Sequence, residues 1–172
     1  FDSDWHDVML TVIHWYLAAN SQSGAIEGSI VHTQTAFELL SSAVLVEQKK
    51  WLSTGGYEKL PAADRIRLLL NWAGISTSIP SFLSNLSSQA SSENWLDTAE
   101  AMTGIRNTII HPTKKNRNKF ATNSVNTRFE TWNLGLWNLE LCLLRLFKHN
   151  GGYANRLTKQ WAGEIDKVPW VN

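Results

Sequence analysis

Several features are scarce or missing in this 172-residue sequence, and each excludes a class of protein. The single cysteine, Cys142, has no partner for an internal disulfide and no metal-ligand spacing around it, which indicates a small buried residue in a reducing cytoplasm. The most apolar stretch, 134–147, contains Asn138, Glu140 and Arg145 and is too short to span a bilayer. We therefore expect a soluble, cytoplasmic protein with no membrane partner.

A large excess of one charge is also lacking. The 16 Lys and Arg residues and 15 Asp and Glu residues give a formal net charge of +1, which excludes a strongly basic nucleic-acid coat but permits a local basic patch. The length and the 43% hydrophobic content suffice for a sizeable core, so we expect residues 1–172 to form a single domain. Because the sequence starts at Phe1 rather than Met, we expect a fragment of a longer protein, whose other part carries regulation.

What the sequence does have is helical periodicity. Apolar residues recur every three or four positions in the stretches 4–20, 25–50, 61–74, 93–111 and 125–149. Shorter helices are predicted around Phe82–Leu86 and over Tyr153–Ile165, whereas residues 87–92 and the basic stretch after His111 are predicted to be loops. No strand pattern of any length is present. The sequence therefore predicts an all-α helical bundle of about five main helices plus short helices.

The residues that are the clearest candidates for a catalytic role are Arg106, Asn107 and His111. A helix turns by about 100° per residue, so Asn107 and His111, four positions apart, share a face, and the long side chain of Arg106 can reach the same anion as His111. The following proline, Pro112, disfavours helical backbone at His111. We therefore expect His111 to lie at the C-terminal end of its helix.

This trio suits the cleavage of a phosphodiester. Arg106 would hold the phosphate and stabilise the transition state, His111 would transfer protons, and Asn107 would orient either partner. RNA supplies its own nucleophile, the 2′-hydroxyl, so the reaction needs no metal. The spacing of these residues does not by itself establish a catalytic role, since an Arg and a His at a helix end are often a cap and a surface charge.

The segment Arg106-Asn107-x-x-x-His111 resembles the R-N-x-x-x-H signature of HEPN domains (higher eukaryotes and prokaryotes nucleotide-binding). Many of these all-helical domains are metal-independent endoribonucleases of bacterial defence and toxin systems. The resemblance implies that Arg106 and His111 are catalytic, that Asn107 supports them, and that two copies of the motif face one composite cleft in a homodimer. The nine tryptophans and the ending Val168-Pro169-Trp170 are similar to the Apea-like anti-phage branch.

Two further groups of residues are candidates for supporting roles. Lys114, Lys115, Arg117 and Lys119 follow the motif, either as a solvated basic loop or as a surface that binds the RNA backbone. Glu38, in the second long helix, is either a solvated helix charge or a carboxylate that orients Arg106 or His111.

The function we expect is that of a metal-independent endoribonuclease of a bacterial defence or toxin-type system, acting through 2′-hydroxyl attack at a composite dimer site. Its partners would be RNA, a second copy of the chain, and a regulatory domain or antitoxin, with no metal and no cofactor. The alternative is a catalytically silent HEPN-like module that binds RNA or nucleotide, or dimerises, within a larger defence protein.

Overall fold

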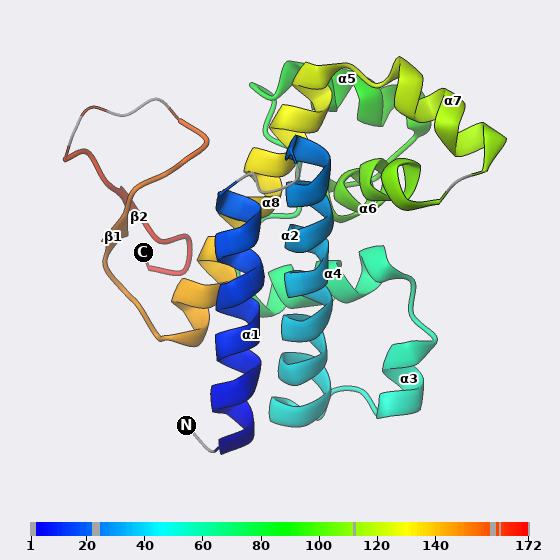
Figure 1. The fold of residues 1–172 in the computed structure, drawn as a ribbon. Helices are drawn as coiled ribbons and strands as arrows, with labels where there is room; N and C mark the ends of the chain where they lie inside the picture. Colours follow the sequence, from blue (N-terminus) through cyan, green and yellow to red (C-terminus); the bar gives the residue numbers. More distant parts are fainter. Residues whose placement is uncertain (1–2, 22–24, 112, 159–160, 162, 172) are drawn as a thin grey trace.

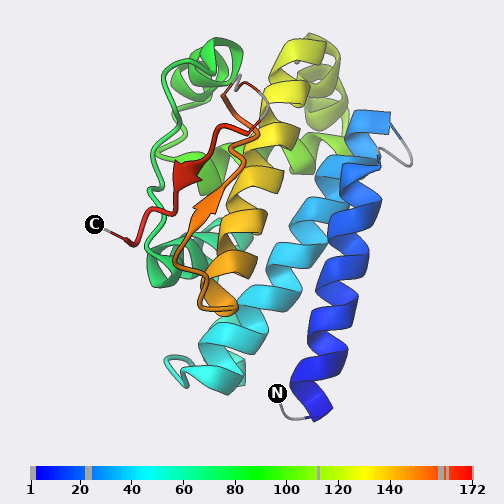
Figure 2. The ribbon, with the colours of Figure 1, turned by 90° about the vertical axis from the view of Figure 1, so that its left-hand side faces the viewer.

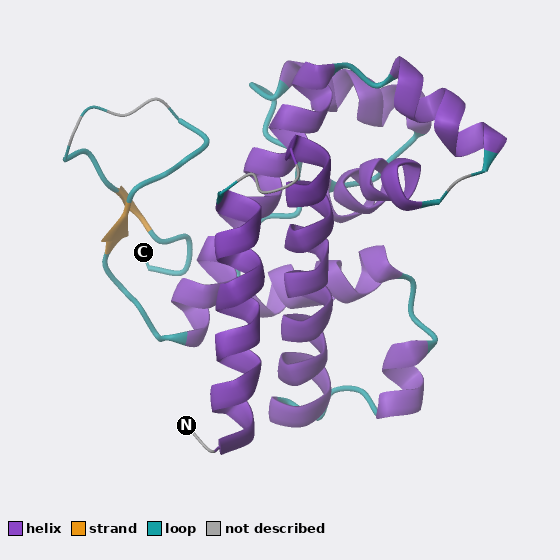
Figure 3. Ribbon diagram, viewed as in Figure 1, coloured by secondary structure: helices purple, strands orange, loops and turns teal. Residues whose placement is uncertain are grey.

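The computed structural model describes residues 3–21, 25–111, 113–158, 161 and 163–171. Across these residues the chain forms helices joined by short connections, and two very short strands near its C-terminus (Figure 3). The elements in chain order are α1 Ser3–Asn20, α2 Ala25–Ser42, a π-helical segment Ala43–Gln48, α3 Thr54–Glu58, α4 Ala62–Ala73, α5 Ser84–Glu93, α6 Thr98–Ile110, α7 Lys114–Thr122, α8 Val125–Leu146, β1 Gly152–Tyr153 and β2 Asp166–Lys167. The predicted all-α class is confirmed.

Helix α2 lies at the centre of the bundle. It packs against α1, α4, α6 and α8, and α1 runs antiparallel beside it (Figures 1 and 2). Helix α7 extends from α6 at the edge of the molecule, and the C-terminal segment with β1 and β2 lies on the opposite side (Figure 1). The motif helix α6 is therefore held against the central helix, whereas α7 is peripheral.

The core forms because α2, α4 and α8 bury apolar faces against one another. Burying one Leu or Phe side chain contributes about 1.5–3 kcal/mol to folding. The side chains with no exposed surface include Phe37, Leu40, Ile66, Leu69, Leu70, Leu134, Leu136, Leu139, Leu141 and Cys142. Burial also raises the pKa of the Cys142 thiol, which confirms that this cysteine is a buried packing residue.

The prediction of a loop over residues 87–92 is wrong, since they belong to helix α5. Serines favour loops by propensity, but two effects override it. Leu86 and Ala90, one turn apart, are buried. At the start of the helix, Glu130 of α8 accepts hydrogen bonds from the backbone N–H of Asn85 at 3.4 Å and of Leu86 at 2.7 Å. A distant carboxylate thus satisfies helix-end donors that a local cap usually satisfies.

The basic stretch after His111 is also not a loop: residues 114–122 form helix α7. Its start is fixed by Thr113, whose side chain accepts a hydrogen bond from the backbone N–H of Asn116 at 3.2 Å. No residue of α7 is buried, which explains why hydrophobic periodicity did not reveal it. The motif helix is shorter than predicted, because Asn94 ends α5 in left-handed backbone and Asp97 then caps α6.

The predicted helix over Tyr153–Ile165 is wrong for the part of this segment that the structure describes. Tyr153 pairs with Asp166 in a two-residue antiparallel ladder instead. The Tyr153 hydroxyl accepts a hydrogen bond from the indole N–H of Trp137 at 3.0 Å. Ile165, which the predicted helix would have buried, is 66% exposed.

Over the described ranges, none of the helices is both long enough and apolar enough to cross a membrane.

Candidate active site

The first turn of α6 is fixed by a network of charges. The Asp97 side chain accepts a hydrogen bond from the backbone N–H of Glu100 at 3.0 Å and so caps the helix. Arg67 of α4 donates to Asp97 at 2.5 Å and to Glu100 at 3.2 Å, and it also pairs with Asp64. The hydrogen bond to Asp97 is the main cause of the raised pKa of Arg67. This network holds the motif helix in a defined position against α4.

The C-terminal end of α6 is at His111, as the sequence predicts. The backbone of His111 is extended, with φ −97° and ψ 111°, and its N–H donates to the Asn107 carbonyl at 3.2 Å. This conformation is the one that a residue preceding a proline prefers. The imidazole is exposed and forms no hydrogen bond or ion pair with any residue that the structure describes.

Arg106 has neighbours on two helices. Its Nη1 donates to Oδ1 of Asn107 at 3.3 Å, and its Nη2 lies 3.6 Å from Oε1 of Glu38 in α2. The side chains of Arg106 and Glu38 are 20% and 35% exposed, so the pair is partly shielded from water. Gln34, one turn before Glu38, donates to the same carboxylate at 3.3 Å. The structure therefore brings Arg106, Asn107 and Glu38 together, but not the imidazole of His111.

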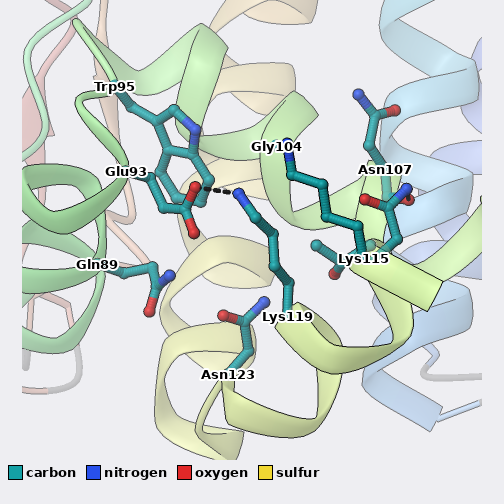
Figure 4. A pocket seen from close by; sticks show the side chains of 10 residues that line it. Gln89, Glu93, Trp95, Gly104, Asn107, Lys115, Lys119 and Asn123 are labelled. Carbon is teal, nitrogen blue, oxygen red and sulfur yellow. Dashed lines mark hydrogen bonds and ion pairs between the residues drawn. The ribbon is translucent and has the colours of Figure 1, made fainter. Parts of the chain in front are cut away.

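Two of the four basic residues after the motif line a cavity. Lys115 and Lys119, four positions apart, share one face of α7, and both face a cavity between α7, α6 and α5 (Figure 4). Lys119 forms an ion pair with Glu93 across this cavity. Lys114 and Arg117 are exposed and do not line it.

The cavity, called here the α5–α7 pocket, has a volume of about 210 Å³. It is lined by Gln89, Glu93, Trp95, Gly104, Asn107, Thr108, Lys115, Asn116, Lys119 and Asn123. Asn107 joins it to the motif, because the Asn116 amide donates to the Asn107 carbonyl at 3.3 Å. Arg106 and His111 do not line the pocket. The candidate active site and the pocket are therefore neighbours that meet at Asn107.

Most residues that line the pocket could not be identified from the sequence. Gln89 and Glu93, four positions apart, share a face of α5, but residues 87–92 lack the apolar pattern that would predict this helix, and Asn123 comes from a distant segment at the end of α7. The packing of Trp95 against Gly104 is equally hidden, although it is tight: a Cβ atom at residue 104 would lie 2.4 Å from the Trp95 ring. Among the described residues, no group of three His, Cys, Asp or Glu side chains is placed to hold a metal ion.

Comparison with known proteins gives the family. The family model of the YopA C-terminal domain matches residues 2–168. The chain belongs to the YopA C-terminal domain family. Similar to it is the SPbeta prophage-derived uncharacterized protein YopA of Bacillus subtilis (strain 168), which is 31% identical over 171 residues. The alignment with YopA covers 98% of the present chain and 37% of the relative, so the chain spans little more than a third of that protein's length. No solved structure matches the chain.

Proposed function

We propose that this YopA C-terminal domain is a metal-independent endoribonuclease whose reaction is carried out by Arg106 and His111, with Asn107 in support. The observation that carries the proposal is the placement of Arg106. Its Nη1 lies 3.3 Å from Oδ1 of Asn107 and its Nη2 lies 3.6 Å from Oε1 of Glu38, on a fixed helix that ends at the exposed His111. A cation held in advance of the reaction stabilises developing negative charge without a cost of reorganisation.

The proposed reaction divides between the two charged residues. The 2′-hydroxyl of a ribose attacks the adjacent phosphorus and the bond from phosphorus to the 5′-oxygen breaks, which leaves a 2′,3′-cyclic phosphate and a 5′-hydroxyl. His111 takes the proton from the attacking hydroxyl or gives one to the leaving oxygen. Arg106 holds the phosphate oxygens, since a guanidinium binds phosphate through paired N–H donors.

A homodimer would complete this site. In the single chain, no hydrogen bond joins the imidazole of His111 to Arg106 within the described residues, and we propose that a substrate or a second copy brings the two groups together. Ile110, an apolar residue beside the motif, is 36% exposed. The HEPN resemblance supports a pairing in which two motifs face each other. In such a dimer the phosphate would lie between residues of both copies.

The biological setting that we propose is conflict between a phage and its bacterial host. The YopA relative is named as prophage-derived, and an endoribonuclease of a defence or toxin-type system would act in the cytoplasm, where RNA is available. The Apea-like likeness of the tryptophans and the C-terminal tail supports the same setting. Uncontrolled cleavage of RNA would harm the cell, so we propose that a regulatory domain or an antitoxin restrains the activity.

The second candidate is a catalytically silent module that binds RNA or nucleotide, or that dimerises, within a larger protein. Two internal ion pairs favour the form of this module that only dimerises, since Glu38 and Glu93 already engage Arg106 and Lys119. An anion at either site would have to compete with a carboxylate. Binding of RNA without cleavage, by a protein shown to be folded, would support this candidate.

The test is cleavage of labelled RNA in excess EDTA by the wild-type protein, Arg106→Ala and His111→Ala. The proposal predicts cleavage by the wild type and its loss in both variants. Lys59→Ala is the control, because Lys59 is exposed and lies in the connection between α3 and α4, outside the motif. Cleavage that survives in both motif variants would contradict the proposal. So would a requirement for Mg²⁺.

A further inference from the structure

The α5–α7 pocket contains a buried polar group that folding leaves without a partner. Asn123 is 5% exposed, and its Oδ1 has no hydrogen-bond donor among the described residues. A buried acceptor in this state is unfavourable, and native proteins nearly always pair such groups. A partner that arrives from outside the chain would account for its retention. Asn123 lines the pocket, and Figure 4 shows its amide at the pocket's edge, directed inward.

The position of Asn123 is fixed by its backbone. Its N–H donates to the Lys119 carbonyl at 2.9 Å at the end of α7. Its own carbonyl accepts a hydrogen bond from Nη1 of Arg128 at 2.6 Å. The Arg128 guanidinium in turn pairs with Glu27 of α2 at 2.9 Å. The backbone that carries the Asn123 amide is therefore held in place by α7 and by Arg128 of α8, which is itself paired with α2.

The other walls of the pocket offer the groups that a nucleotide would use. Trp95 provides a flat aromatic surface, and stacking of a base on an aromatic side chain is a general mode of single-strand recognition. Gln89 reaches toward the pocket from α5, with an amide that can donate and accept (Figure 4). Lys115 forms no ion pair with the described residues and lines the side nearest Asn107. It is available to a phosphate.

The size of the pocket limits what it can hold. Its volume of about 210 Å³ corresponds to roughly seven water molecules at about 30 Å³ each. This is room for one ring system with its substituents, but not for a folded RNA. The pocket meets the motif at Asn107, so a base bound in it would belong to a nucleotide beside the phosphate at Arg106.

We propose that the α5–α7 pocket binds one base of the RNA, and that Oδ1 of Asn123 accepts a hydrogen bond from the exocyclic amino group of that base. Adenine, cytosine and guanine carry such a group, and uracil does not. The pocket would therefore select the nucleotide next to the cleaved bond. This inference rests on the proposed function for its substrate class, RNA, but its test does not depend on cleavage.

The test is a binding measurement with RNA that cannot be cut by 2′-hydroxyl attack. Fluorescence anisotropy in EDTA would compare two 2′-O-methyl uridine hexamers. One carries a central adenine, and the other carries purine riboside, which differs from adenosine only in lacking the amino group. Wild type is expected to bind the adenine oligomer about tenfold more tightly, which is the effect of one hydrogen bond to a buried acceptor. Equal binding of the two oligomers by the wild type would overturn the proposal.

Two variants make the measurement specific to Asn123. Asn123→Leu removes the acceptor and keeps the branched shape of the side chain, so the two oligomers should bind equally while the melting temperature stays at or above that of the wild type. Asn123→Ala repeats the test with a smaller side chain if Leu disturbs the fold. The matched control is Asn126→Leu, at an exposed position of α8 outside the pocket, which should keep the tenfold difference.

The two proposals fail separately. A protein that discriminates between the oligomers but does not cut RNA would retain the pocket proposal and lose the ribonuclease. A protein that cuts RNA but binds both oligomers equally would retain the ribonuclease and lose the base pocket. Discrimination that persists in both Asn123 variants would show that another group reads the base.

Discussion

Arg106 and Glu38 lie 3.6 Å apart on two packed helices, α6 and α2, with both side chains partly shielded from water. A pair of this kind contributes only about 0–1 kcal/mol to stability, so its larger effect would be on geometry. Glu38 limits the positions that the Arg106 guanidinium can take, and Gln34 limits Glu38 through a hydrogen bond at 3.3 Å. Under the proposed function, Glu38 is a positioning residue for the phosphate-binding cation.

The first prediction concerns this pair. Glu38→Gln should lower kcat for RNA cleavage by about tenfold, because a displaced guanidinium stabilises the transition state less well. KM and the melting temperature should change little. Glu47→Gln, at an exposed site of the π-helical segment, is the matched control and should behave as wild type. An unchanged kcat in Glu38→Gln would mean that Glu38 is simply a solvated charge.

The second prediction concerns Gly104, in the middle of α6. Replacing a helical glycine with alanine ordinarily stabilises a helix by about 1 kcal/mol. At Gly104 the new Cβ would lie 2.4 Å from the Trp95 ring, so the ring must move. Gly104→Ala should therefore lower the free energy of unfolding by about 1–3 kcal/mol, measured by urea denaturation.

Gly55 offers a matched control for that experiment. It also lies within a helix, α3, and nothing would be within 4 Å of an added Cβ. Gly55→Ala should be neutral or slightly stabilising. A stabilising effect of alanine at residue 104 as well would contradict the packing of Trp95 described above.

The third prediction concerns the start of α5. Glu130 accepts hydrogen bonds from the N–H groups of Asn85 and Leu86, so Glu130→Ala leaves both donors without their acceptor. We expect a loss of about 1–2 kcal/mol and faster hydrogen exchange at these two amides than in the wild type. Exposed Glu58, replaced by Ala, is the control. Exchange rates unaffected by the loss of Glu130 would show that α5 is held by Leu86 and Ala90 alone.

The fourth prediction concerns alkaline pH. The chain has three tyrosines, Tyr16, Tyr57 and Tyr153, and burial raises the pKa of all three above the ordinary value of 10.0. The folded state then holds these protons more tightly than the unfolded state. The stabilisation is complete below pH 10 and is lost as the pH rises through the folded pKa values.

Urea denaturation at a series of pH values would test this dependence. The free energy of unfolding should fall as the pH rises above 10.0, and Tyr57→Phe should make the fall less steep. In the wild type, the Tyr57 hydroxyl donates to the Glu38 carbonyl at 2.9 Å, so its replacement also reports on the helix that carries Glu38. A free energy of unfolding that does not fall as the pH rises above 10.0 would be inconsistent with buried, protonated tyrosines.

The sequence predicts those parts of the fold that depend on periodic apolar burial or on backbone restriction. Helix α8 is recognisable because its leucines repeat, and the end of α6 at His111 is recognisable because a proline follows. Helix α7 is not, because none of its residues is buried. Helix α5 depends on Glu130, which is more than 40 positions away in the sequence. The pattern of residues within α5 does not predict a contact with a residue so far away in the sequence.

The same distinction applies to the candidate site. Arg106, Asn107 and His111 are close in sequence, so helical geometry alone relates them, and Arg106 and Asn107 are indeed in contact. The sequence leaves Glu38 open as a solvated charge or a carboxylate that orients the motif, and the packing of α2 on α6 places it 3.6 Å from Arg106. The α5–α7 pocket combines isolated polar residues of α5, α6 and α7 with Asn123, and only the tertiary structure could reveal it.

The most direct measurement of the central claim is the chemical identity of the RNA ends. A defined RNA oligonucleotide, incubated with the protein in excess EDTA, would be examined by mass spectrometry beside the His111→Ala variant. The account predicts fragments with a 2′,3′-cyclic phosphate and a 5′-hydroxyl for the wild type, and intact RNA for the variant. Fragments with 5′-phosphate ends, or the same fragments from His111→Ala, would contradict it.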